Sequence, residues 1–200
     1  MKPQNRTKSS AIGEIPTIAP QSWWDRRIVP RLTQCACSQG QIMKVRSHIV
    51  PLASGDVMEL GCGGGINMAF YDWAKVRSVT GLDPSPQLLE MSLDAARAHG
   101  LEAKGLKPNI LLGHGEAMPF ADHSFDTVMT SFTLCSVGNP AAVFSEIRRI
   151  LRPDGQALFL EHGLAPHPAP AKWQRRIEPI WKRMAGNCHL SRPIAAAYEA

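Results

Sequence analysis

The sequence of 200 residues lacks any apolar stretch near the roughly 20 residues that a membrane-spanning helix requires. Residues 1–10 are basic and polar with no apolar block behind them, so no secretory signal is evident and we expect a cytoplasmic protein. Hydrophobic residues make up 44% and charged residues 20% of the chain, which are ordinary values for a folded domain. These values exclude intrinsic disorder and a collagen-like structure.

Cysteine is too scarce and too irregularly spaced for a disulfide framework or a zinc ribbon. The chain has 5 cysteines, an odd number, and no Cys-x-x-Cys pair. Cys35 and Cys37 could bind a soft metal if His48 or Cys188 folded against them, but two reduced thiols in a helical cap are the simpler interpretation. We therefore predict no metal site.

Negative charge is scarce at both ends of the chain. The net charge of +5 divides into +6 over residues 1–50, −5 over residues 51–165 and +4 over residues 166–200. Basic ends around an acidic centre favour an anionic partner, substrate or membrane surface, although solvated basic faces would give the same pattern. No basic stripe with interleaved aromatic residues is evident outside one C-terminal helix, so we expect no nucleic-acid partner.

Alternating strand and helix patterns predict a doubly wound, mostly parallel α/β sheet covered by helices on both faces. The apolar patterns divide the chain into a tail and helical cap (1–50), a core (51–163) and a C-terminal helical lid (164–200), with a loose tail over residues 1–20. Strands are predicted at 56–60, 78–82, 109–112, 126–130 and 156–161, helices at 22–32, 41–50, from about 66, 87–100, 141–151 and from 194, and a turn at 152–155.

The C-terminal part carries a basic amphipathic helix. After a proline-rich hinge at residues 165–170, Trp173, Ile177, Trp181 and Met184 recur at helical spacing, and basic residues lie largely elsewhere on the wheel. Such a helix can lie on a membrane surface, close over a pocket or pack on the domain, and Pro179 is expected to kink it.

A glycine-rich turn between a strand and a helix carries the main functional signal. Residues 61–65 read Gly-Cys-Gly-Gly-Gly, and glycines of this kind let the backbone pass close under a ligand. A dinucleotide fingerprint needs Gly-x-Gly-x-x-Gly, but Ile66 or Met68 stands where its last glycine should be. No Gly-Lys-Ser/Thr follows, so a P-loop is excluded as well.

Glu59, Gly61, Gly63 and Gly65 match the motif E/D-x-G-x-G-x-G in register, and the chain here resembles the class I S-adenosylmethionine-dependent methyltransferases with a type 11 methyltransferase domain. The segments 81–85, 113–120, 125–129 and 148–155 resemble further family motifs in the same order. The resemblance covers about residues 56–162 and implies a Rossmann-like fold, S-adenosyl-L-methionine as cofactor and S-adenosyl-L-homocysteine as product.

The resemblance also assigns cofactor contacts. Asp83, at the end of the second strand, would accept hydrogen bonds from both ribose hydroxyls. Glu59 would lie toward the amino-acid end of the cofactor, and the segment 115–118 along the adenine. The complete expected set is Glu59, Gly61, Cys62, Gly63, Gly65, Asp83, Pro84, Gly115, Glu116, Ala117, Met118 and Thr130.

Residues beyond the fifth strand bear on the methyl acceptor, a small molecule. The pair Glu161-His162 and the run 186–192 are similar to the animal alkyl thiol methyltransferases of the methyltransferase-like seven group, which implies a small lipophilic thiol. His162 is the candidate base, or else a histidine hydrogen-bonded within the fold. A phospholipid amine or a quinone ring carbon as acceptor, peripheral membrane contact through the basic termini, and an inactive cofactor-binding scaffold stay open.

The number of strands departs from the family pattern. The family's sheet has seven strands, and only five can be counted here, so we expect a sheet that lacks the last two. An uncovered strand edge invites aggregation. We therefore expect the tail helix or a second subunit of a homo-oligomer to cover it.

Overall fold

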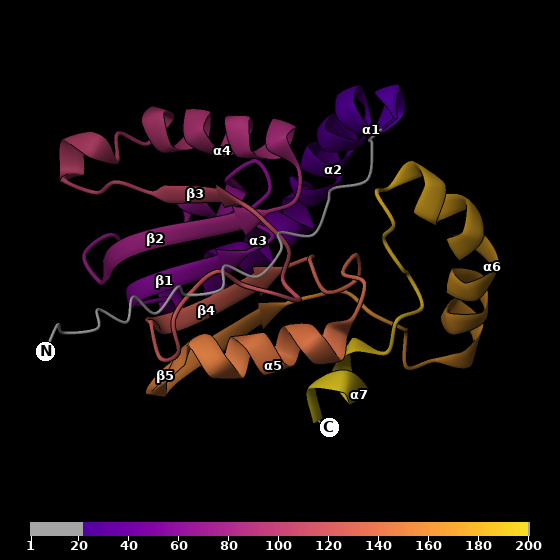
Figure 1. Cartoon of the computed structure of the whole chain (residues 1–200). Helices are drawn as coiled ribbons and strands as arrows, with labels where there is room; N and C mark the ends of the chain where they lie inside the picture. Colours follow the sequence, from indigo (N-terminus) through magenta and orange to yellow (C-terminus); the bar gives the residue numbers. More distant parts are fainter. Residues whose placement is uncertain (1–21, 200) are drawn as a thin grey trace, which may run out of the picture.

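A five-stranded, all-parallel sheet forms the centre of the molecule (Figure 1). The computed structural model describes residues 22–199, so the expected loose tail at residues 1–20 lies outside the described part. The strand order is β3-β2-β1-β4-β5, and the doubly wound parallel fold is confirmed. The strands are β1 (Gly55–Leu60), β2 (Val76–Asp83), β3 (Asn109–Leu112), β4 (Phe125–Ser131) and β5 (Leu151–Leu160).

Helices cover both faces of the sheet and surround its carboxyl edge (Figure 1). Two of them have clear start signals, because Ser85 and Asn139 each accept a hydrogen bond from a backbone N–H in the first turn and each precedes a proline. The helices are α1 (Trp23–Arg27), α2 (Val29–Cys37), α3 (Gly40–Ile49), α4 (Pro86–Ala98), α5 (Pro140–Ile150), α6 (Pro168–Met184) and α7 (Ile194–Glu199), with 3-10 turns η1 (Val50–Leu52), η2 (Ile66–Ala69) and η3 (Glu102–Lys104).

Alternation along the strands sends successive side chains to two separate apolar cores. On one face, Met58 and Val128 pack with Ile147 and the other apolar residues of α5. On the other face, Val57 and Met129 pack with the end of α3 and with η1. The central strands β1, β2 and β4 are therefore buried on both sides, as strands of parallel sheets generally are.

Two predicted elements around the sheet differ in the structure. The helix expected from about residue 66 is only the short 3-10 turn η2, because the chain must return to begin β2 at Val76. The turn expected at 152–155 is an irregularity inside β5, where Leu151 pairs with Phe125 but Gln156 already pairs with Thr127. The extra residues leave Pro153 and Asp154 exposed near the start of β5, at the edge of the sheet opposite the carboxyl ends of the strands.

The N- and C-terminal helices also differ from the predicted boundaries. The helix expected over 22–32 is divided into α1 and α2, with Pro30 at the start of the second helix. The proline-rich hinge is partly helical, because α6 begins at Pro168, where a missing backbone N–H costs nothing. The helix predicted from residue 194 is confirmed as α7.

Strand β5 is one of the two outer strands of the sheet in residues 22–199, and β3 is the other. The tail does not pair with β5 but returns just beyond its carboxyl end, where the Leu164 N–H donates to the Arg192 carbonyl over 2.9 Å. Helix α7 then packs on α5. The tail helix therefore does not complete the sheet, and a covering second subunit stays a prediction.

Candidate active site

A cavity of about 1140 Å³ lies at the carboxyl edge of the sheet. Its floor is made by the loops that follow β1, β2, β3 and β4, and its walls come from α2, α3 and the end of α6. The neighbours β1 and β4 mark the point where the strand order reverses, which is where open α/β sheets bind ligands. Pockets for a single small ligand usually have volumes of about 300–1000 Å³, so this cavity has room for a cofactor and an acceptor together.

The glycine loop after β1 forms a cradle on the floor of this cavity. Gly61 and Gly63 have φ angles of 67° and 53°, which favour glycine. A side chain at Gly61 would overlap that of Thr133, whereas a Cβ at Gly63 would meet only the Gly61 carbonyl, 4.0 Å away. Backbone at Gly63 therefore stays open to close approach by a ligand.

Asp83 joins this loop to the loop that follows β2. The carboxylate accepts hydrogen bonds from the backbone N–H groups of Gly63, over 3.0 Å, and Ser85, over 2.9 Å. Each carboxylate oxygen keeps acceptor capacity, and Asp83 and Pro84 both line the cavity. Burial raises the pKa of Asp83, and the two backbone N–H groups oppose that rise. The position and acceptor chemistry fit a pair of ribose hydroxyls.

Beneath the cradle lies a buried polar network around Glu59. Its two carboxylate oxygens accept from the Asn67 amide over 2.7 Å and from the Tyr71 hydroxyl over 2.8 Å. The buried Arg46 guanidinium donates to the Asn67 carbonyl oxygen and, over 3.0 Å, to the Ser131 hydroxyl. Burial raises the pKa of Glu59 to about 7, although the hydrogen bonds and the Arg46 charge act in the opposite direction. Arg46, Asn67 and Tyr71 were not predicted, because nothing in their local sequence shows that they converge.

In the predicted cofactor segment 115–118, some residues line the cavity and others hold the loop in place. Gly115 and Ala117 line the cavity. Glu116 also lines it, but its carboxylate accepts from the N–H groups of Gly138, over 2.7 Å, and Asn139, over 3.1 Å. It therefore ties this loop to the start of α5.

Three predicted cofactor residues lie outside the cavity lining. Met118 is buried in the core beside α5. Gly65 lets α4 approach, since a Cβ there would lie 3.0 Å from the Ala95 Cβ. Thr130 is fully buried in β4 between the neighbouring strands. The predicted residues that line the cavity are Glu59, Gly61, Cys62, Gly63, Asp83, Pro84, Gly115, Glu116, Ala117 and His162.

The loop that follows β4 is held in a strained conformation. Phe132 has a φ angle of 56°, which is unfavourable for a bulky side chain and is frequent at functional sites. The half-buried Glu161 carboxylate holds the loop by accepting from the N–H groups of Thr133, over 3.0 Å, and Leu134, over 3.1 Å. The Phe132 ring stacks on His162 with centroids 6.1 Å apart and lies 5.4 Å from the Arg46 guanidinium carbon.

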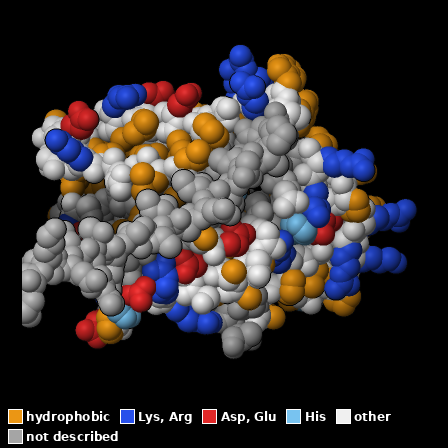
Figure 2. Space-filling model, viewed as in Figure 1, with side chains coloured by type: hydrophobic (Ala, Val, Ile, Leu, Met, Phe, Trp, Pro, Cys, Tyr) orange, Lys and Arg blue, Asp and Glu red, His pale blue; other side chains and the backbone are white. Residues whose placement is uncertain are grey.

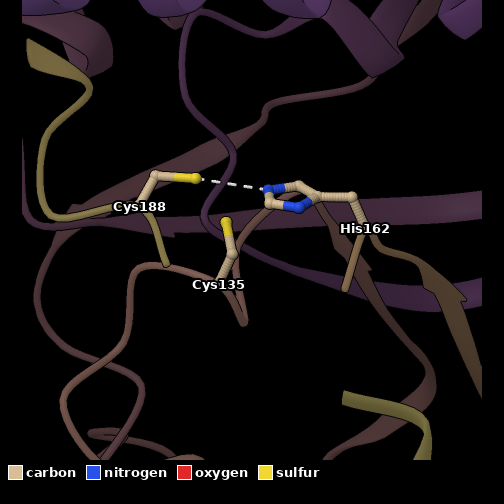
Figure 3. Close-up of side chains that lie close together, drawn as sticks. All are labelled: Cys135, His162 and Cys188. Atoms are coloured by element: carbon tan, nitrogen blue, oxygen red, sulfur yellow. Dashed lines mark hydrogen bonds between the residues drawn. The ribbon is translucent and has the colours of Figure 1, made fainter. Parts of the chain in front are cut away.

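His162 meets two cysteines at the wall of the cavity (Figure 3). The sulfur of Cys188 lies 3.3 Å from Nε2 of His162, and Cys135 completes a group whose ligand atoms all lie within 4.8 Å of one another. The hydrogen bond to Cys188 raises the pKa of His162. Hydrogen bonds from Cys135 and His162 lower the pKa of the Cys188 thiol, while burial opposes them. Cys135 is buried, and its place beside His162 and Cys188 could not be foreseen from the sequence.

The segment that carries Cys188 is fastened to the loop after β4. The Arg192 guanidinium donates to the carbonyl oxygens of Leu134, over 2.6 Å, and Val137, over 2.7 Å. The His189 N–H donates to the Cys135 carbonyl over 2.9 Å. These bonds give Cys188 a defined position opposite His162.

A family model described as "Methyltransferase domain" matches residues 58–159, about half of the chain. The chain belongs to this methyltransferase family. It is 40% identical over 144 residues to the human protein named "Thiol S-methyltransferase TMT1B", a match that covers 70% of this chain and 57% of the relative. The rat protein of the same name is 38% identical over 138 residues, or 68% of this chain and 54% of the relative. The chain thus spans just over half the length of these relatives.

Solved structures show the same fold. A putative methyltransferase from Bacillus halodurans superposes with a TM-score of 0.64 at 20% identity, covering 80% of this chain and 66% of that chain. YcgJ from Bacillus subtilis superposes with a TM-score of 0.63 at 19% identity, covering 78% of this chain and 67% of that one. The class I methyltransferase fold is confirmed, and S-adenosyl-L-methionine is the cofactor of this family. The open glycine cradle and the acceptor atoms of Asp83 fit that molecule.

No helix within residues 22–199 is long and apolar enough to cross a membrane. A yeast relative, 28% identical over 132 residues (60% of this chain and 28% of that protein), is named "Methyltransferase OMS1, mitochondrial". The cytoplasmic location stays a prediction.

Proposed function

We propose that the protein transfers a methyl group from S-adenosyl-L-methionine to the sulfur of a small lipophilic thiol. One observation carries this proposal: a single cavity joins the glycine cradle and Asp83 to an apolar chamber under α2 and α6, with His162 in its wall. Apolar side chains that include Val29, Ile42 and Trp181 line this chamber. The thiol methyltransferase names of the human and rat relatives support the choice of a thiol.

The two ends of the cavity have separate tasks in this reaction. Asp83 and the backbone at Gly63 would hold the nucleoside and keep it in one orientation. The cofactor supplies an electrophilic methyl group on a sulfonium sulfur. His162 would accept the thiol proton at Nε2, the nitrogen that faces Cys188 in the structure. Because an in-line displacement needs no covalent enzyme intermediate, holding the sulfur in line in a dry chamber supplies most of the catalysis.

The outer face of α6 supports a lipophilic acceptor. Trp173 and Ile180 are 64% and 68% exposed, and Lys and Arg side chains gather beside hydrophobic ones at the α6 end of the molecule (Figure 2). Trp181 and Lys182 of the same helix line the cavity. A basic surface with exposed tryptophan fits an anionic membrane surface, which would bring the cavity close to a reservoir of lipophilic molecules.

Calorimetric titration with S-adenosyl-L-methionine and S-adenosyl-L-homocysteine tests the cofactor site. Wild type should bind both, and Asp83→Ala should weaken binding by about 10-fold or more, because a lost hydrogen bond to a charged group costs roughly 1.5–3 kcal/mol. Asp94→Ala is the matched control, since Asp94 is an exposed acid on α4. Absence of binding to wild type, or equal binding by Asp83→Ala, would contradict the assignment.

An acceptor screen then tests the thiol. Alkyl thiols should be methylated, with thioether and S-adenosyl-L-homocysteine formed in equal amounts. Methylation confined to phosphatidylethanolamine or to a quinone would replace the thiol by that acceptor. Tight cofactor binding without turnover on any of the three classes would favour an inactive binding scaffold.

A further inference from the structure

Cys135, His162 and Cys188 form a group of soft donor atoms that three separate parts of the chain bring together (Figure 3). Cys135 lies in the loop after β4, His162 follows β5, and Cys188 follows α6. Two sulfurs and one imidazole nitrogen are donors typical of zinc sites. All three residues also line the cavity, so a metal held here would face the same space as the proposed acceptor.

The spacing of the donor atoms suits a tetrahedral ion. Zinc bonds of about 2.3 Å to sulfur and about 2.0 Å to nitrogen separate neighbouring donor atoms by roughly 3.5–3.8 Å. The Nε2 of His162 and the sulfur of Cys188 are 3.3 Å apart, and all three donors lie within 4.8 Å. Small rotations of the side chains would therefore bring the three atoms to a common centre.

The surroundings hold these donors in place. The Cys135 sulfur lies 3.4 Å from the Phe132 carbonyl oxygen, and the Phe132 ring stacks on His162. The Arg192 guanidinium holds the loop that carries Cys135. Supporting contacts of this kind orient ligands in metal sites and contribute to their affinity.

The described group supplies three ligands, whereas zinc takes four. Three protein ligands with an open fourth position are the pattern of a catalytic zinc, and a closed set of four is structural. Cys135, His162 and Cys188 all line the cavity, so an open fourth position would face the chamber; Cys37 lines the same cavity but is not a member of the group.

We propose that Cys135, His162 and Cys188 bind Zn²⁺, and that the open fourth position takes the sulfur of the thiol acceptor. The second half of the proposal rests on the proposed function. A thiol that binds zinc releases its proton to water and becomes a thiolate. The thiolate electron pair forms the new bond to the methyl carbon, and the broken carbon–sulfur bond returns its pair to the cofactor sulfur. The products are a thioether and S-adenosyl-L-homocysteine. In this version of the reaction the metal promotes ionisation of the thiol, and His162 binds the metal instead of accepting the thiol proton.

Cobalt substitution tests the site without any need for turnover. Chelator-treated full chain is titrated with Co²⁺ and then with Zn²⁺ under reducing conditions. One Co²⁺ per chain should bind with a thiolate-to-cobalt charge-transfer band and intense visible bands, and Zn²⁺ should displace it. Cys135→Ser and Cys188→Ser should each reduce the charge-transfer band and weaken binding by more than about 100-fold, because loss of a supporting contact alone costs 10–100-fold.

Two matched variants complete the test. Cys35 is exposed, so Cys35→Ser should leave the cobalt spectrum unchanged. Addition of an alkyl thiol to the cobalt-loaded wild type should strengthen the charge-transfer band as a third sulfur binds, and Cys37→Ser should respond in the same way. A thiol effect that is absent in wild type and appears in Cys37→Ser would show that Cys37 closes the site, and would overturn the open position.

The metal proposal and the proposed function fail in different ways. Absence of Co²⁺ binding, or binding that Cys135→Ser and Cys188→Ser leave unchanged, overturns the metal site. Full thiol methylation by metal-free protein would overturn its catalytic part and leave the proposed function standing. Metal binding by a protein that methylates no thiol would leave the metal site standing and would overturn the proposed function, together with the catalytic part that rests on it. Circular dichroism of each serine variant confirms that it is folded.

Discussion

The buried carboxyl of Glu59 should make the protein less stable as the pH rises toward neutrality. Its pKa is about 7 in the folded protein and 4.5 in a free chain, so the folded state binds the proton more tightly. Between these two values the folded state holds more protons than the unfolded state, and the free energy of unfolding falls as pH increases. A difference of this size corresponds to about 3 kcal/mol, most of it lost between about pH 5 and pH 8.

Glu59→Gln removes the titration and keeps a side chain of nearly the same shape beside Asn67 and Tyr71. Urea unfolding followed by tryptophan fluorescence, at a series of pH values from about 5 to 8, measures the effect. The free energy of unfolding of wild type should fall by about 2–3 kcal/mol more than that of Glu59→Gln across this range. Glu102→Gln, an exposed glutamate on η3, should follow the wild-type curve. Parallel curves for wild type and Glu59→Gln would refute the reasoning.

Two further predictions concern the cradle and the surface of α6. Gly61→Ala adds a clash with Thr133 to the strain of a positive φ, whereas Gly100→Ala, at φ 62° with no atom within 4 Å of a Cβ, carries the strain alone. In thermal unfolding, Gly61→Ala should lower the free energy of unfolding by more than the roughly 1–2 kcal/mol that strain alone costs at Gly100→Ala. Only Gly61→Ala should lose cofactor binding in calorimetry. Equal effects of the two variants would contradict the role of the clash. In flotation assays, anionic vesicles should retain wild type and Leu93→Glu, a control at a 38% exposed residue of α4, but not Ile180→Glu. Failure of wild type to float would remove the membrane contact from the proposed function.

The strands and the glycine cradle could be predicted because their signals are local. A two-residue alternation decides which face of a strand is buried, and the spacing of Gly61 and Gly63 reports the turn that passes under a ligand. Asp83 follows its strand directly, so its place at the carboxyl edge follows from the strand itself. The predicted boundaries of helices and strands were wrong in two places: at η2, where a short 3-10 turn replaces the expected helix, and inside β5, where extra residues bulge out of the strand pairing.

Motif positions alone did not separate ligand contacts from supporting residues. Gly65 and Met118 fall within the family motifs, yet Gly65 makes room for α4 and Met118 fills the core beside α5. Whether a motif residue faces the cavity depends on the helix that packs against it, and that helix belongs to a different part of the chain.

The sequence by itself determined the doubly wound sheet, the family and the cofactor cradle, since each depends on residues that are neighbours along the chain. Only the tertiary structure placed Arg46 over the Asn67–Glu59 network and brought Cys188 to His162, 26 residues away, and to Cys135. Side chains from separate loops carry no shared periodicity or spacing. Their convergence is decided by how α3, α6 and the loop after β4 pack around the carboxyl edge of the sheet.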